Sequence, residues 1–223
     1  MNFLLLASAP VIIIAFYIYF RDRYEKEPLG MLMKSVLIGA VIVLPVSLIE
    51  IILSIPLHHF SGYMNPAWNA FVVAGFTEEL FKFLVLYFMI WKNKNFNEPF
   101  DGIVYAVFIS LGFALIENIL YVINGGMEVA VLRAFTAVPA HALFGVAMGF
   151  YFAKAKYKPA SRVFNILLCL LIPIILHGSY DFILMSGNSI LITLFIPYMI
   201  YLGYQGLKMI NASSEDSRPG AVV

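Results

Sequence analysis

The sequence predicts an all-α, polytopic transmembrane helix bundle of about seven spans, or eight if one helix is short or broken. Of its 223 residues, 62% are hydrophobic and only 12% are charged, and the mean hydropathy is +0.90. A soluble domain is closer to half apolar and a quarter charged, so this composition indicates that lipid surrounds much of the chain. No basic stretch is dense enough to follow a nucleic-acid backbone.

Seven hydrophobic runs are long enough to cross a hydrocarbon core of about 30 Å. They lie at residues 2–20, 31–55, 68–91, 101–123, 129–152, 164–185 and 189–208. The connections are short, so we expect one transmembrane domain over residues 1–210. The polar segment 211–223 is predicted to be a disordered cytoplasmic tail. The first run has no basic n-region or cleavage site and is expected to be a retained span.

Lysine and arginine alternate between the connecting loops. The loops after the first, third, fifth and seventh runs are basic, whereas those after the second, fourth and sixth contain no Lys or Arg. Cytoplasmic loops carry the excess of positive charge. The pattern therefore predicts an odd number of spans, with the N-terminus outside and the C-terminus in the cytoplasm.

Ionisable side chains lie inside several predicted spans, although a charge at the bilayer centre costs at least about 2.5–3.5 kcal/mol. Such residues normally face the bundle interior and mark a functional site. They are Glu78, Glu79, Lys82, Glu117, Arg133, His141, His177 and Asp181. Arg133 and Glu50 lie near the outer ends of their spans and are expected to be interfacial, with their charged groups reaching water.

The depth of the central polar residues follows from the helical rise of about 1.5 Å per residue. Measured from the outer surface, the depths are roughly 15 Å for Glu78, 9 Å for Glu117, 18 Å for His141 and 12 Å for His177. Four helices thus place polar groups between the midplane and the outer face. Unrelated structural residues would have no reason to share a depth, so we expect one common polar site.

Spacing along the helices predicts two local pairs. Glu78 and Lys82 are four residues apart and share a helix face. His177 and Asp181 have the same spacing, which lets the carboxylate orient or charge the imidazole. Glu79 is rotated by about 100° from Glu78, so the two carboxylates should make different contacts. The competing interpretations are a structural Glu78–Lys82 ion pair and, for His141, a hydrogen-bonded core histidine.

These residue types suit hydrolysis. A positioned carboxylate can act as general base on water, and a histidine paired with a carboxylate can stabilise a developing oxyanion. The sequence contains no H-E-x-x-H zinc motif, no G-x-G-D motif and no G-x-S-x-G serine context. Glutamate and histidine are therefore the remaining candidates for catalysis.

Three motifs, in this order along the chain, resemble the PrsW family of bacterial multi-pass proteases, which are related to the CAAX prenyl-protein endopeptidases and to bacteriocin-processing membrane enzymes. They are Glu78-Glu79-x-x-Lys82, Phe113-x-x-x-Glu117 and His177-x-x-x-Asp181. The segments RDRYEKEP, DGIVYA, HALFGVAMGFY and HGSYDFIL extend the resemblance over most of the chain.

The resemblance implies a role for each of these residues. Glu78 would be the base that activates water, and Glu117 stands where the prenyl-protease relatives have a histidine that shares this task. His177 and Asp181 would stabilise the oxyanion, and Glu79 would orient the site. The supporting residues would be Lys82, His141, Asn118 and Phe113.

The resemblance also implies an intramembrane endopeptidase of the bacterial plasma membrane that makes the first cut in a single-pass anti-sigma factor during a stress response, with no cofactor. Two alternatives stay open. A zinc-dependent protease could hold its metal with Glu117, His141, His177 or their neighbours, because carboxylate and imidazole suit zinc. A proton-coupled carrier or a lipid-binding scaffold could use the same carboxylates as a relay.

Overall fold

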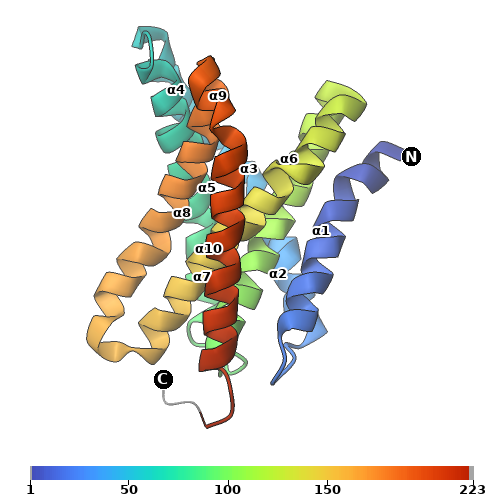
Figure 1. Ribbon diagram of the computed structural model, residues 1–223, viewed down its shortest axis with the longest axis vertical. Coiled ribbons are helices and arrows are strands. Elements are labelled where there is room, and N and C mark those ends of the chain that lie inside the picture. Colours follow the sequence, from blue (N-terminus) through green and yellow to red (C-terminus); the bar gives the residue numbers. More distant parts are fainter. Residues whose placement is uncertain (1, 221–223) are drawn as a thin grey trace.

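The computed structural model describes residues 2–220 as a helix bundle, with no strand in that range (Figure 1). The helices are α1 (Asn2–Arg21), α2 (Leu29–Val41), α3 (Val43–Ser54), α4 (Met64–Trp68), α5 (Thr77–Ile90), α6 (Pro99–Phe135), α7 (Ala137–Tyr157), α8 (Arg162–Met185), α9 (Ser189–Thr193) and α10 (Phe195–Asp216). Two 3₁₀ segments (Ile55–His59 and Pro159–Ser161) and a π-helical segment (Asn69–Phe76) connect them. The predicted all-α class is confirmed.

The hydrophobic runs are helical, but several of them are broken. Breaks follow α2 at Ile42, α6 at Thr136 and α9 at Leu194, and a proline lies three residues after each break: Pro45, Pro139 and Pro197. Proline removes a backbone donor, and its ring clashes with the carbonyl four residues earlier. The three prolines thus account for the interruptions.

Within residues 2–220, three helical segments are long and apolar enough to cross a membrane: Leu29–His59, Pro99–Tyr157 and Pro159–Met185. The second of these folds back on itself at Gly126, whose φ of 73° and ψ of −157° favour glycine. A straight helix would hold Glu117 and Arg133, sixteen residues apart, about 24 Å from each other. Because the chain reverses, Arg133 Nη2 instead lies 3.1 Å from Glu117 Oε2.

The connections gather at two ends of the bundle (Figure 1). The lower end of the view contains three of them, which run from α1 to α2, from α5 to α6 and from α7 to α8, and also the C-terminal end of α10. The links from α3 to α4 and from α8 to α9, with the Gly126 turn, lie at the upper end. The basic loops therefore share one end, the lower end. The count of seven spans and the orientation in the membrane remain predictions.

The segment predicted to be a disordered tail is partly helical. α10 continues to Asp216, past the expected boundary at residue 210. Ser213, Ser214 and Ser217 are buried, and the Ser217 hydroxyl accepts a hydrogen bond from the Phe100 amide at 2.8 Å. The hydrogen bond to the start of α6 therefore helps to hold in place a segment that its polar composition predicts to be mobile.

α6 is the central helix, and glycines let its neighbours approach it closely. Every residue from Pro99 to Ala114 is buried. A β-carbon added at Gly149 of α7 would lie 2.2 Å from the Gly102 carbonyl oxygen of α6, and one at Gly112 would lie 2.1 Å from the Val36 carbonyl oxygen of α2. Contacts between small residues of this kind are typical of packed membrane helices.

Gly149→Val is expected to separate α7 from α6 and to destabilise the protein by about 1–3 kcal/mol, the usual cost of overpacking. Thermal unfolding of the purified protein in detergent measures this loss. Gly203→Val in α10 is the matched control, because a β-carbon there would meet nothing within 4 Å. Equal unfolding temperatures for the two variants would contradict the close α6–α7 contact.

Candidate active site

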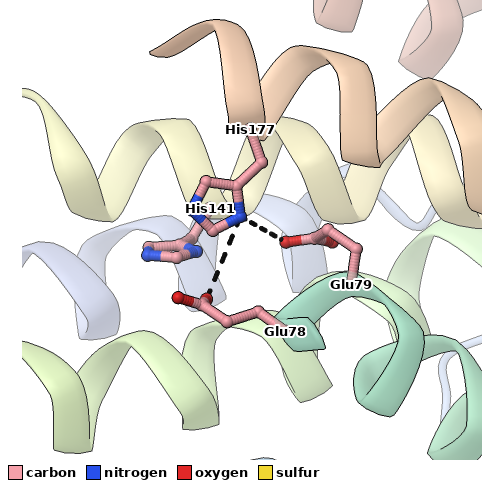
Figure 2. Close-up of side chains that lie close together, drawn as sticks. All are labelled: Glu78, Glu79, His141 and His177. Carbon is pink, nitrogen blue, oxygen red and sulfur yellow. Dashed lines mark hydrogen bonds and ion pairs between the residues drawn. The ribbon is translucent and has the colours of Figure 1, made fainter. Parts of the chain in front are cut away.

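Four acidic and basic side chains from three helices meet inside the bundle. Figure 2 shows Glu78 and Glu79 at the start of α5, His141 on α7 and His177 on α8, all pointing toward one another. All four are buried. The preceding segment Asn69–Phe76 is π-helical, a rare geometry found often at functional sites.

Lys82 lies at the centre of this cluster. Its Nζ is 3.0 Å from Glu78 Oε2, 2.8 Å from Glu79 Oε1 and 3.2 Å from His141 Nδ1. Since an ammonium group only donates, His141 accepts at Nδ1 and carries its proton on Nε2. That Nε2 donates to Glu117 Oε2 at 2.7 Å. The predicted Glu78–Lys82 ion pair is thus present, and Lys82 also joins α5 to α7.

His177 lies among three carboxylates. Its Nδ1 lies 2.9 Å from Glu79 Oε1 and 3.9 Å from Glu78 Oε2, and its Nε2 lies 3.4 Å from Asp181 Oδ2. The ring stacks on Phe144 with centroids 4.9 Å apart. With an acceptor at each nitrogen, the imidazole can be protonated at both and donate from both. The i, i+4 pairing with Asp181 is present as predicted.

Glu117 receives a cation from across the Gly126 turn. Arg133 Nη2 lies 3.1 Å from its Oε2, while Arg133 Nε donates to Asn118 Oδ1 at 3.0 Å. Asn118 in turn donates to the Ala7 carbonyl of α1 at 2.9 Å. The expectation that Arg133 is interfacial is therefore wrong, because the chain reversal carries its side chain onto Glu117.

A cavity of about 280 Å³ opens onto these groups. The charged side chains that line it are Glu50, Glu78, Glu117, Arg133, His141, His177 and Asp181. Glu79 is completely buried and Lys82 is 1% exposed, and neither lines the cavity. The two neighbouring glutamates are therefore not equivalent: Glu78 faces the cavity, and Glu79 lies behind it.

All nine predicted site residues fall in or directly against one network. Phe113 belongs to it because Lys82 Nζ lies 4.3 Å from the centre of its ring. Three further residues, which the sequence pattern did not indicate as part of the site, also line the cavity: Glu50, Arg133 and Phe144. Glu50 was expected to be interfacial, but α3 carries it onto the cavity wall. The sequence did contain one sign that Glu50 belongs to the site, because this glutamate lies within an apolar run.

The donor set has the composition of a zinc site. Glu78, Glu79, His141 and His177 each offer one ligand atom, and these atoms lie within 4.8 Å of one another. Two imidazoles with carboxylates are common zinc ligands. Three of these residues, however, already contact Lys82 Nζ. A zinc ion bound there would have to displace the ammonium group. The residue types therefore suit a zinc site better than their arrangement does.

Comparison with known proteins gives concordant results. The family model described as PrsW family intramembrane metalloprotease matches residues 27–203. Proteins named "Protease PrsW" match at 38% identity from Geobacillus kaustophilus, covering 96% of this chain and 93% of the relative, and at 40% from Bacillus subtilis, covering 90% of each. The Clostridioides difficile relative of the same name is 41% identical over 91% of this chain and 87% of its own. No solved structure matches the chain.

Proposed function

The chain belongs to the PrsW family of intramembrane proteases and is a multi-pass bacterial membrane protein; we propose that it hydrolyses peptide bonds by a glutamate-dependent mechanism. The single observation that supports this most is the position of Glu78. It is the carboxylate that both faces the cavity and contacts the buried Lys82.

In the proposed reaction, Glu78 removes a proton from a water molecule in the cavity. The water oxygen forms a bond to the scissile carbonyl carbon, and the carbonyl electron pair moves onto its oxygen. His177 donates a hydrogen bond to that oxyanion from Nε2, shared with the Asp181 oxygen 3.4 Å away, while its Nδ1 stays bound to Glu79. When the C–N bond breaks, the proton on Glu78 passes to the leaving amine, and no acyl-enzyme forms.

The remaining residues position these groups. Lys82 fixes both carboxylates of α5 and accounts for the tautomer of His141. His141 and Arg133 hold Glu117 at the cavity wall, where its carboxylate can hydrogen-bond the attacking water. The two carboxylates of α5 therefore contact Lys82 and His177, whereas Glu117 contacts His141 and Arg133.

We propose that the substrate is a single-pass membrane protein, an anti-sigma factor cut first on its extracytoplasmic side. The depths predicted from the span edges put the polar site toward the outer face, which suits a cut on that side of the membrane. The test is co-expression of the protein with candidate single-pass anti-sigma factors and immunoblotting for a shortened product. A product that appears only with the active protein supports the proposal. If every candidate stays intact while ion flux into liposomes depends on the protein, a proton-coupled carrier is favoured instead.

A zinc-dependent protease is the second candidate, favoured by the four clustered donors and by the description of the matching family as metalloproteases. Glu78, Glu79, His141 and His177 would hold the ion, which when bound would polarise the scissile carbonyl and make water more nucleophilic at neutral pH. Elemental analysis of active, chelator-washed protein separates the candidates. The glutamate mechanism predicts zinc far below one ion per chain, and one tightly held ion per chain would contradict it.

A further inference from the structure

A second group of carboxylates, two of them completely buried, lies far from the active site. Asp22 follows α1, Glu98 precedes α6, and Asp101 is in the first turn of α6. Carboxylate oxygens of these three residues lie within 4.8 Å of one another. Asp101 is sixteen residues before Glu117 on the same helix, which places the two about 24 Å apart. The cluster therefore lies at the lower end of the bundle in Figure 1, where the connection from α1 to α2 and that from α5 to α6 meet.

Two of the segments singled out in the sequence supply this cluster, and the proposed reaction uses neither. RDRYEKEP carries Asp22 and Glu27, and DGIVYA carries Asp101 and Tyr105. The Tyr105 hydroxyl donates to Glu27 Oε2. Asp101 Oδ2 accepts hydrogen bonds from the Asn97 amide at 2.8 Å and the Glu98 amide at 2.7 Å. Backbone and side-chain donors thus satisfy one carboxylate oxygen each of Asp101 and Glu27.

Other oxygens in the cluster lie against other carboxyl groups, since Asp22 faces Glu98 and Asp101 faces Glu27. Asp22 and Asp101 are completely buried, yet Asp22 Oδ1, Asp101 Oδ1 and Glu98 Oε1 accept no hydrogen bond within the described residues. In that same part of the chain, no lysine, arginine or histidine nitrogen comes within 4.0 Å of their carboxylates. A buried charge without a partner is strongly unfavourable, so something must neutralise this cluster.

The nearby lysines form no direct ion pair with these carboxylates. Lys26 Nζ donates to the backbone carbonyls of Tyr19 and Asp22, and Lys156 Nζ donates to the Phe96 carbonyl at 2.5 Å. The described residues therefore supply no cation that pairs directly with these carboxylates.

We propose that Asp22, Glu98 and Asp101 bind a hard divalent cation, Mg²⁺ or Ca²⁺, at the lower end of the bundle. All the available ligand atoms are oxygens, which these two cations prefer over softer metals. A bound cation would clamp the connection from α1 to α2 against the start of α6, the central helix. This site is separate from the peptidase cluster, and its existence does not depend on the proposed reaction.

The test is cation binding by the purified full-length protein in detergent. Mn²⁺ serves as a spectroscopic probe in competition with Mg²⁺ and Ca²⁺, and thermal unfolding is followed with each cation and with EDTA. We expect Mg²⁺ or Ca²⁺ to raise the unfolding temperature of the wild type. Asp22→Asn and Glu98→Gln should each weaken Mn²⁺ binding by about tenfold or more. Glu25→Gln is the matched control, because this neighbouring glutamate is exposed.

Two results would overturn the proposal. One is a wild type that binds no Mn²⁺ and unfolds at the same temperature with cation and with EDTA. The other is equal Mn²⁺ affinity in the wild type and in Glu98→Gln, which would place any bound ion elsewhere. If Asp22→Asn does not fold, Glu98→Gln still decides the question, because Glu98 is only partly buried and its substitution should be tolerated.

Discussion

Glu78→Gln is expected to abolish peptide-bond cleavage while the protein still folds and inserts. The amide has the shape of the carboxylate, and its oxygen can still accept a hydrogen bond from Lys82, but it cannot take a proton from water. Loss of a general base typically lowers the rate by about 10²–10⁴-fold. The rate is measured with purified protein and a single-pass membrane substrate by following the product on gels.

Glu128→Gln is the matched control for this substitution. Glu128 is exposed near the Gly126 turn and does not line the cavity, so its variant should cut at the wild-type rate. A Glu78→Gln protein that cut within a few-fold of the control would exclude Glu78 as the base. A loss of activity that came with a lowered unfolding temperature would instead indicate a structural role.

Lys82→Met should have the largest effect on stability of any single substitution in the site. It leaves Glu78 and Glu79 buried without the cation that both contact. Breaking a buried ion pair by removing one partner costs about 3–5 kcal/mol. We therefore expect poor expression or a much lower unfolding temperature, together with loss of cleavage. Thermal unfolding in detergent measures the first effect.

Adding Glu79→Gln to Lys82→Met separates stability from catalysis. The second change removes one of the two uncompensated carboxylates, so the double variant should unfold at a higher temperature than Lys82→Met while it stays inactive. Lys208→Met provides the control, because Lys208 is exposed on α10. If Lys82→Met unfolded at the same temperature as Lys208→Met, the buried ammonium would not be holding the two glutamates.

Local spacing predicted the contacts that lie within one helix. Residues four apart on a helix share a face whatever the fold, which is why the Glu78–Lys82 and His177–Asp181 pairs could be found in the sequence. Their common depth also indicated that separate helices would bring them together. The network in the structure agrees with that inference, because Glu79 of α5 contacts His177 of α8.

Contacts between helices could not be predicted in the same way. The Arg133–Glu117 pair depends on the backbone angles of Gly126, and a glycine in the sequence does not say which way the chain turns. Lys82 reaches His141 because α5 and α7 both pack against α6 and α8 and so face each other across the cluster, an arrangement that depends on all the neighbouring side chains. Hydropathy was also unable to locate the breaks at Ile42, Thr136 and Leu194, since the apolar pattern continues across them.

The second buried cluster was missed because its residues are distributed over loops. Asp22 and Glu98 lie in polar connections, where acidic residues are ordinary and usually solvated. Only the folded chain brings them to Asp101 and excludes water from their oxygens. The segments RDRYEKEP and DGIVYA stood out in the sequence, but nothing in their spacing indicated that they meet.

The most direct test of the glutamate mechanism is the cleavage rate of chelator-washed, zinc-free protein toward a single-pass substrate. Wild type and Glu78→Gln are compared in the same preparation, with and without added zinc. Activation of water by Glu78 predicts that the metal-free wild type cuts at its full rate, that zinc does not increase this rate, and that Glu78→Gln is inactive under both conditions. A metal-free wild type that is inactive and recovers when one equivalent of zinc is added would contradict it.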